Sequence, residues 1–129
     1  MGIELKLLAW SMLLGVAHLL LTSAAVTHQR GLAWNASARD DDGPPLKPLP
    51  ARLQRAQRNF METFPFFAAA VLAVVIAGRQ DSNTALAVQL YFWARVVYLP
   101  LYAAGIPYLR SLVWVVSLVG VMKLVWTLV

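Results

Sequence analysis

Long apolar segments separated by polar ones dominate the chain. Each apolar segment has about the 20 residues that a helix needs to cross the roughly 30 Å hydrocarbon layer of a bilayer. The four segments run from Leu5 to Thr27, from Phe60 to Ala77, from Thr84 to Ala104 and from Pro107 to Val129. The pattern predicts an all-α, integral membrane four-helix bundle that forms one domain over residues 1–129, with helices at about 5–27, 51–78, 83–104 and 107–129.

The first apolar segment resembles a secretory signal peptide at one point. Thr22-Ser-Ala-Ala has the small residues of a cleavage region after an apolar run. The run, however, has spanning length, and Glu4 accompanies Lys6 in its amino-terminal flank. We therefore expect the segment to be retained as the first membrane helix.

A long polar connection, about residues 28–50, joins the first two predicted helices. It is rich in Asp, Gly and Pro, and we expect Pro48 and Pro50 to delay the next helix until Ala51. Its composition fits either a solvated connector or a lid over a ligand. The two later connections are short turns with a glycine each, and the first of them also offers a cap for the third helix.

The composition agrees with a membrane protein. Hydrophobic residues make up 60% of the 129 residues and charged residues 13%, which is too apolar for an ordinary soluble domain. The chain has no cysteine, so thiol chemistry would need a borrowed thiol. His18 has no second histidine near it in the membrane, so we interpret it as a helix-packing residue and expect no metal site.

The positive charges predict an orientation in the membrane. The formal net charge is +5, but Lys and Arg are scattered along the spans and their edges, which argues against a nucleic-acid partner. Because positively charged connections favour the cytoplasm, we expect the 28–50 connection to be cytoplasmic and both termini to lie across the membrane. The cytoplasmic side would carry Arg30, Arg39, Lys47, Arg52 and Arg110, and the other side Lys6, Arg79 and Lys123.

The start of the second helix is unusually polar. In the stretch Arg52-Leu-Gln-Arg-Ala-Gln-Arg-Asn-Phe-Met-Glu62, the helical period places Arg55, Asn59 and Glu62 on one face. Arg58 can reach Glu62 one turn further on. Because a charged side chain facing lipid costs about 2.5–3.5 kcal/mol, Glu62 must face protein or a wet cavity.

The third helix adds a second polar face within the membrane. Arg95, Tyr98 and Tyr102 stand at i, i+3 and i+7 and share one side of that helix. We expect the two polar faces to meet, with Arg95 close to Glu62. Residue types alone leave two interpretations open: a ligand site, or a structural ion pair capped by tyrosines.

These two patterns resemble the signatures of a known family. They are Arg55-Ala-Gln-Arg-Asn59-x-x-Glu62-x-x-Pro65-x-Phe67 in the second helix and Ala94-Arg95-x-x-Tyr98-x-x-x-Tyr102 in the third. Together with the four spans and the long first connection, they are similar to the MAPEG family, the membrane-associated proteins in eicosanoid and glutathione metabolism, and to its bacterial-type members. The resemblance implies a homotrimer in a bacterial inner membrane, whose glutathione sites lie between neighbouring subunits near the cytoplasmic face.

The resemblance also implies roles for residues of the second helix. Arg55 would pair with a carboxylate of glutathione, which is the cosubstrate in this family. Gln57 and Asn59 would hydrogen-bond its peptide groups, and Glu62 would receive its ammonium.

The remaining roles fall on the third and fourth helices. Tyr98 and Tyr102 would supply hydroxyl groups from the adjacent wall, and Arg95 would hold Glu62 or a carboxylate of the ligand. Arg110, at the start of the fourth helix, would be the catalytic residue. Its positive charge would lower the pKa of the glutathione thiol and favour the nucleophilic thiolate.

The function that this resemblance implies is a membrane-bound, glutathione-dependent transferase or peroxidase. Its other substrate would be a hydrophobic electrophile or a lipid hydroperoxide that enters from the lipid bilayer. A non-enzymatic membrane scaffold or regulatory protein of the same fold remains the alternative. A small transporter is less attractive, because the chain has neither repeated halves nor intramembrane polar residues along all four spans.

Overall fold

The structure, a computed structural model, describes all residues from 1 to 129. Its helices are α1 (Ile3–Arg30), α2 (Leu32–Ala36), α3 (Pro48–Ile76), α4 (Ser82–Ala103) and α5 (Pro107–Leu128). It has no strands, and the four long helices have the length and apolarity needed to cross a membrane. The predicted all-α, four-helix membrane bundle is confirmed.

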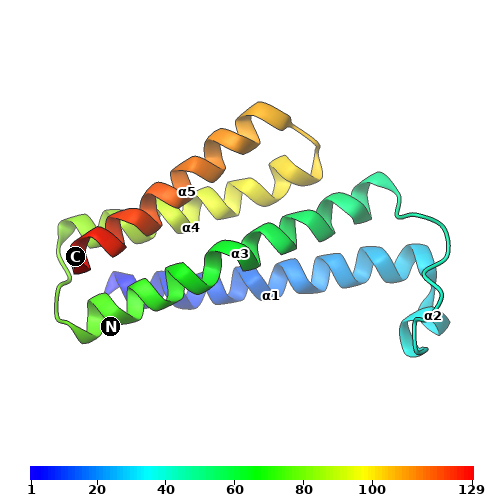
Figure 1. Cartoon of the computed structure of the whole chain (residues 1–129), viewed down its shortest axis with the longest axis horizontal. Helices are drawn as coiled ribbons and strands as arrows, with labels where there is room; N and C mark the ends of the chain where they lie inside the picture. Colours follow the sequence, from blue (N-terminus) through cyan, green and yellow to red (C-terminus); the bar gives the residue numbers. More distant parts are fainter.

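The long helices run alternately in opposite directions, so the connections gather at two ends of the bundle (Figure 1). The terminal end (residues 1–8, 74–88 and 121–129) holds both chain termini and the α3–α4 connection. The arginine end (residues 26–59 and 95–112) holds the α1–α3 connection, with α2, and the α4–α5 turn. The positive residues expected on one side of the membrane therefore do lie at one end.

Helix α3 begins earlier than its prolines suggested. Pro48 and Pro50 both lie in its first turn, so the expectation that they delay the helix until Ala51 is wrong. The first N–H groups of a helix have no acceptor within it, so a residue without an N–H is tolerated there. Arg52 and Arg55 therefore follow a first turn that is already helical, and the helix fixes their relative directions.

The α1–α3 connection folds back against the end of α1. The ring of Trp34 in α2 lies 4.9 Å from the guanidinium of Arg30 and 4.9 Å from that of Arg39. Gln29 of α1 accepts a hydrogen bond from the backbone N–H of Lys47 at 2.8 Å. These contacts tie both ends of the connection to the α1 side of the bundle.

The best-packed part of the core lies toward the terminal end. Phe67 of α3 stacks on Tyr91 of α4 with ring centroids 3.9 Å apart, and the hydroxyl of Tyr91 lies 3.1 Å from that of Thr63. Gly120 lets α5 approach α4 closely, since a Cβ there would stand 2.6 Å from the carbonyl oxygen of Ala87. Such small residues allow close helix contact in a membrane, where packing drives association.

A predicted cap joins α1 to α4 at the terminal end. The Asp81 carboxylate accepts from the Thr84 N–H, and the Thr84 hydroxyl accepts from the Asp81 N–H, both at 2.8 Å. The same hydroxyl lies 3.0 Å from the buried carboxylate of Glu4, to which it donates. The cap therefore satisfies the start of α4 and a buried carboxylate of α1 together.

Candidate functional site

Three arginines share one cavity at the arginine end. It occupies about 220 Å³ between the first turns of α3, the end of α4 and the start of α5. No acidic residue lines it, so the cavity is suited to an anion. Its lining consists of Arg52, Arg55, Tyr102, Gly105, Pro107 and Arg110.

Tyr102 stands at the centre of this arginine pocket. Its hydroxyl accepts a hydrogen bond from Nε of Arg55 at 3.1 Å. The guanidinium of Arg110 lies 4.7 Å from the centroid of the same ring, within the range of a cation–π contact. One aromatic side chain thus orients an arginine of α3 and an arginine of α5, and the predicted residues Arg55, Tyr102 and Arg110 come together.

A second polar layer lies deeper in the bundle. Arg95 is fully buried, and its Nη1 donates to Oδ1 of Asn59 at 2.8 Å. Its guanidinium lies 4.2 Å from the ring of Tyr98, and that ring meets Tyr102 edge-on with centroids 5.5 Å apart. Contacts therefore run without interruption from Asn59 and Arg95 to the arginine pocket.

Several polar atoms of this layer are buried without a partner in the chain. They are Nε and Nη2 of Arg95 and the hydroxyl oxygen of Tyr98. Leaving a buried donor unsatisfied costs about 1–3 kcal/mol, and more for a charged group. A ligand or subunit that brought acceptors to these atoms would remove that cost.

Arg95 does not pair with Glu62, contrary to the expectation that the two lie together. The chain has a single ion pair, between Arg30 and Asp42 at 3.9 Å, and neither Arg58 nor Arg95 forms one with Glu62. Asn59 is turned toward α4 and meets Arg95, whereas Glu62 is exposed on the outer surface of α3. The amide, rather than the carboxylate, therefore holds Arg95.

Gln57 lies on a different side of α3 from Arg55. Two residues along a helix correspond to a rotation of about 200°, which turns Gln57 toward α1. Together with Leu19, it lines two grooves between α1 and α3. One groove is mostly apolar, and the other is bordered by Arg39. Within one subunit, Gln57 is therefore separated from the arginine pocket.

Arg52 belongs to the arginine pocket but was not predicted as a site residue. It precedes Arg55 by three residues, so the helical period places both on one face. That spacing is a usable signal in the sequence. Its guanidinium reaches the α4–α5 turn, where Nη1 points at the carbonyl oxygen of Ala103 from 3.5 Å.

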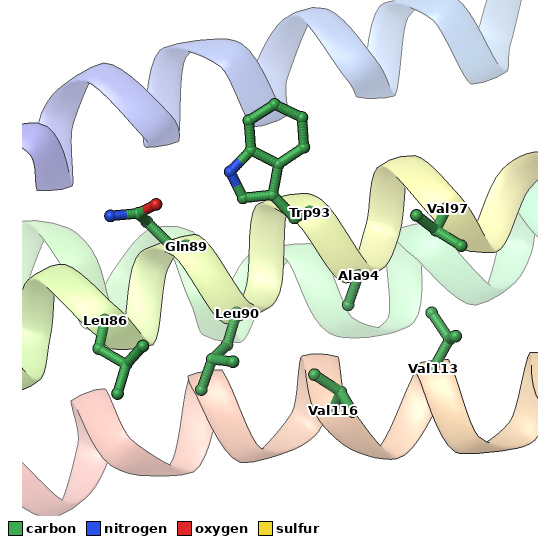
Figure 2. A pocket seen from close by; sticks show the side chains of 8 residues that line it. All are labelled: Leu86, Gln89, Leu90, Trp93, Ala94, Val97, Val113 and Val116. Carbon is green, nitrogen blue, oxygen red and sulfur yellow. The ribbon is translucent and has the colours of Figure 1, made fainter.

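An apolar groove of about 370 Å³ runs between α4 and α5 (Figure 2). Leu90 and Ala94 of α4 point toward α5, whose Val113 and Val116 point back (Figure 2). Seven of its eight lining residues are hydrophobic, and Gln89 is the exception. Val113 lies one helical turn after Arg110, so one end of the groove approaches the arginine pocket.

Comparison with known proteins identifies the family. A search of curated proteins gives no significant match. A family model described as "MAPEG family" matches residues 7–129, which include nearly all of α1 and the whole of the other helices. The chain is therefore an integral membrane protein that belongs to the MAPEG family.

Proposed function

We propose that this protein is a membrane-bound, glutathione-dependent transferase or peroxidase that acts on hydrophobic electrophiles or lipid hydroperoxides. The observation that carries the proposal is the arginine pocket, in which Arg52, Arg55 and Arg110 converge without an acidic neighbour. Glutathione in its thiolate form carries two carboxylates, a thiolate and one ammonium. Its negative groups match a pocket of guanidinium groups, which bind carboxylates strongly.

The hydrogen-bond donors of the site match the acceptor groups of glutathione. Arg55, oriented by Tyr102, would bind a carboxylate. The unpartnered Tyr98 hydroxyl and Arg95 N–H groups would donate to the peptide carbonyls. Asn59, whose oxygen is engaged by Arg95, keeps its amide N–H groups for the ligand.

Arg110 is the proposed catalytic residue. Its contact with Tyr102 directs its charge into the pocket, where it lowers the pKa of the glutathione thiol by stabilising the thiolate. The thiolate sulfur then bonds to the electrophilic atom of the second substrate as the leaving group departs. With a hydroperoxide, two glutathione molecules are oxidised to the disulfide while the hydroperoxide is reduced to an alcohol and water.

We also propose a homotrimer whose sites lie between neighbouring subunits. Arg58 and Glu62 are exposed on α3 in the single chain, and exposure of such charges to lipid is costly. A neighbouring subunit would cover them and allow Glu62 to receive the ammonium of glutathione. Gln57, which faces away from its own pocket, would then contribute to a neighbour's site. A cavity of about 220 Å³ is also smaller than the roughly 300–1,000 Å³ of typical ligand pockets, as a partial site would be.

The second substrate would reach the site from the bilayer. The apolar groove between α4 and α5 offers a surface for such a molecule, because it opens among exposed residues such as Trp93 and Val97. Its end at Val113 lies one helical turn beyond Arg110 on α5. By the distribution of positive charge, the pocket would face the cytoplasm, and a bacterial inner membrane is the proposed location.

The experiment that tests the proposal is calorimetric titration of glutathione into the detergent-purified protein, followed by a turnover screen with generic electrophiles and hydroperoxides. We expect saturable binding that Arg55→Ala weakens at least tenfold, since a charge-assisted hydrogen bond contributes about 1.5–3 kcal/mol. Arg79→Ala, at the terminal end, is the matched control and should bind as the wild type does. No binding by a folded oligomer would reject the proposal.

A membrane scaffold or regulatory protein is the second candidate. It is favoured by the contacts of Arg95 with Asn59 and Tyr98, which join α3 to α4 without any ligand. Glutathione binding with turnover on any electrophile would reject this alternative.

A further inference from the structure

A groove on the outer side of α5 is separate from the sites described above. It occupies about 400 Å³ and is lined by residues of α5 from Val115 to Trp126, among them Lys123, and by Asn83 of α4. Five of its seven lining residues are hydrophobic. It shares no lining residue with the arginine pocket or with the groove between α4 and α5, so it requires an explanation of its own.

The polar residues of this α5 groove lie at one of its ends. Lys123 and Trp126 belong to the last two turns of α5, and Asn83 belongs to the first turn of α4, so all three lie at the terminal end. Lysine and tryptophan are typical of a membrane boundary. The apolar part extends from Lys123 back to Val115, about 12 Å along the helix. This is less than half of the roughly 30 Å hydrocarbon layer, so the groove lies within one leaflet.

The charge of Lys123 is not neutralised within the chain. The single ion pair of the protein joins Arg30 and Asp42 at the arginine end, and no acidic residue lines the α5 groove. Two carboxylates of the terminal end, those of Asp81 and Glu4, are both bonded to Thr84. Because a charge within a membrane span is costly without a partner, the polar end of the groove is suited to an anion.

Arg79, in the α3–α4 connection, adds a second cation beside this end. Its Nη1 donates to the carbonyl oxygen of Thr127 at 3.1 Å. Thr127 lies one helical turn after Lys123, and its hydroxyl donates to the carbonyl oxygen of Lys123 at 2.9 Å. The contact with Thr127 uses one of the five N–H donors of the guanidinium, and the exposed side chain offers the others to a ligand.

A ligand that fits this arrangement has an anionic group at the membrane boundary and an apolar chain that reaches into one leaflet. A phospholipid has both, since its phosphate accepts hydrogen bonds from ammonium, guanidinium and amide groups, and its acyl chain matches the apolar part of the groove. A soluble anion would leave that apolar part unfilled. Two cations also favour a headgroup of net negative charge, because they would repel the ammonium of a zwitterionic one.

We propose that the α5 groove binds an anionic phospholipid of the leaflet at the terminal end. Its phosphate lies at Lys123 and Arg79, and one acyl chain lies against α5. The lipid connects the α3–α4 connection to α5, because the two cations belong to different segments. This site does not depend on the proposed enzymatic function.

The test measures lipid binding to the full-length protein in detergent by native mass spectrometry, with phosphatidylglycerol and phosphatidylcholine of the same acyl chains. A basic residue near an anionic lipid contributes about 1 kcal/mol, or about fivefold in affinity. Lys123→Gln and Arg79→Gln should each lower the preference for phosphatidylglycerol about fivefold, and Lys123→Arg should keep it. Lys6→Gln, at the same end but outside the groove, is the matched control and should preserve the preference.

Val119→Trp tests the apolar part of the groove without changing a charge. It should weaken the binding of long-chain phosphatidylglycerol and spare that of the dihexanoyl form, whose chains are too short to fill the groove. Equal effects on the two lipids, or none on either, would place the acyl chain elsewhere and overturn the proposal.

Three further results would also overturn it. The first is a lipid preference that neither Lys123→Gln nor Arg79→Gln changes. The second is inorganic phosphate that displaces the lipid at the same concentration as dihexanoyl phosphatidylglycerol does, because the site would then recognise phosphate alone. The third is a change of oligomer size in Lys123→Gln with an unchanged lipid preference, which would make the groove a contact between subunits.

Discussion

The two ends of the bundle treat buried polar groups in opposite ways. At the terminal end, the hydroxyl of Thr84 is bonded both to the carboxylate of Glu4 and to the backbone N–H of Asp81, which caps α4. At the arginine end, Arg95 keeps two buried nitrogen atoms without a partner, and the Tyr98 hydroxyl is also unpaired.

The difference separates buried polar groups that are satisfied within the chain from those that are left for another partner. Polar groups whose partners lie within the chain stabilise the fold by themselves. Groups that are buried or gathered without a partner lower stability until something else binds them. The arginine end is therefore where a ligand or a neighbouring subunit should raise stability, and the terminal end is where mutations should reduce stability without affecting a ligand of the arginine pocket.

The largest effect should come from the close contact of α4 and α5. Gly120→Ala places a Cβ 2.6 Å from the backbone oxygen of Ala87, so the helices must separate. We expect a loss of roughly 1–3 kcal/mol, the usual cost of overpacking a core, measured as a lower midpoint of thermal unfolding in detergent. Val119→Ala, an exposed neighbour on α5, is the control. An unchanged midpoint would mean that this contact is looser than described.

An intermediate effect should appear at Arg95, whose unpartnered nitrogen atoms distinguish the arginine end from the terminal end. Arg95→Met removes a buried charge with unsatisfied donors, so stability without ligand should stay within about 1 kcal/mol of the wild type or rise. Glutathione affinity should fall about tenfold as the donors are lost. Unfolding and calorimetry on the same sample provide both values. A loss of more than about 2 kcal/mol with unchanged affinity would instead make Arg95 structural, as in the scaffold alternative.

The smallest effect should come from the cap of α4. Thr84→Val keeps the shape of the side chain but removes the hydroxyl shared by Asp81 and Glu4. The expected cost is about 1 kcal/mol, the typical value for a lost helix cap. Glutathione affinity should match the wild type, and a change in affinity would show that the two ends are coupled.

The periodicity of the chain was enough to predict the spans and part of the site. Long apolar runs require membrane helices, and the spacing of Arg95, Tyr98 and Tyr102 places them on one face whatever the packing. The capped start of α4 also follows from local residues, because a cap is formed within one turn.

Contacts between segments that are far apart in the sequence could not be predicted from periodicity. Arg95 could have met Asn59 or Glu62, which lie three residues apart, and only the rotation of α3 against α4 selects the amide. The contact of Arg52 with Ala103 likewise depends on how the start of α3 meets a turn some 50 residues later. Gln57 shows the reverse case, since the role implied by the family resemblance is not met within the chain, where Gln57 faces α1.

Because the first and last residues emerge at the same end, away from the arginine pocket, three copies can be joined in tandem by flexible linkers that need not cross the bilayer (Figure 1). Such a concatemer allows each repeat to be altered separately. One repeat would carry Arg55→Ala and another Gln57→Ala. The number of glutathione sites that remain would show whether one site takes Arg55 from one subunit and Gln57 from its neighbour. Because both termini lie at one end, mutations in single repeats can determine how many subunits contribute residues to each site.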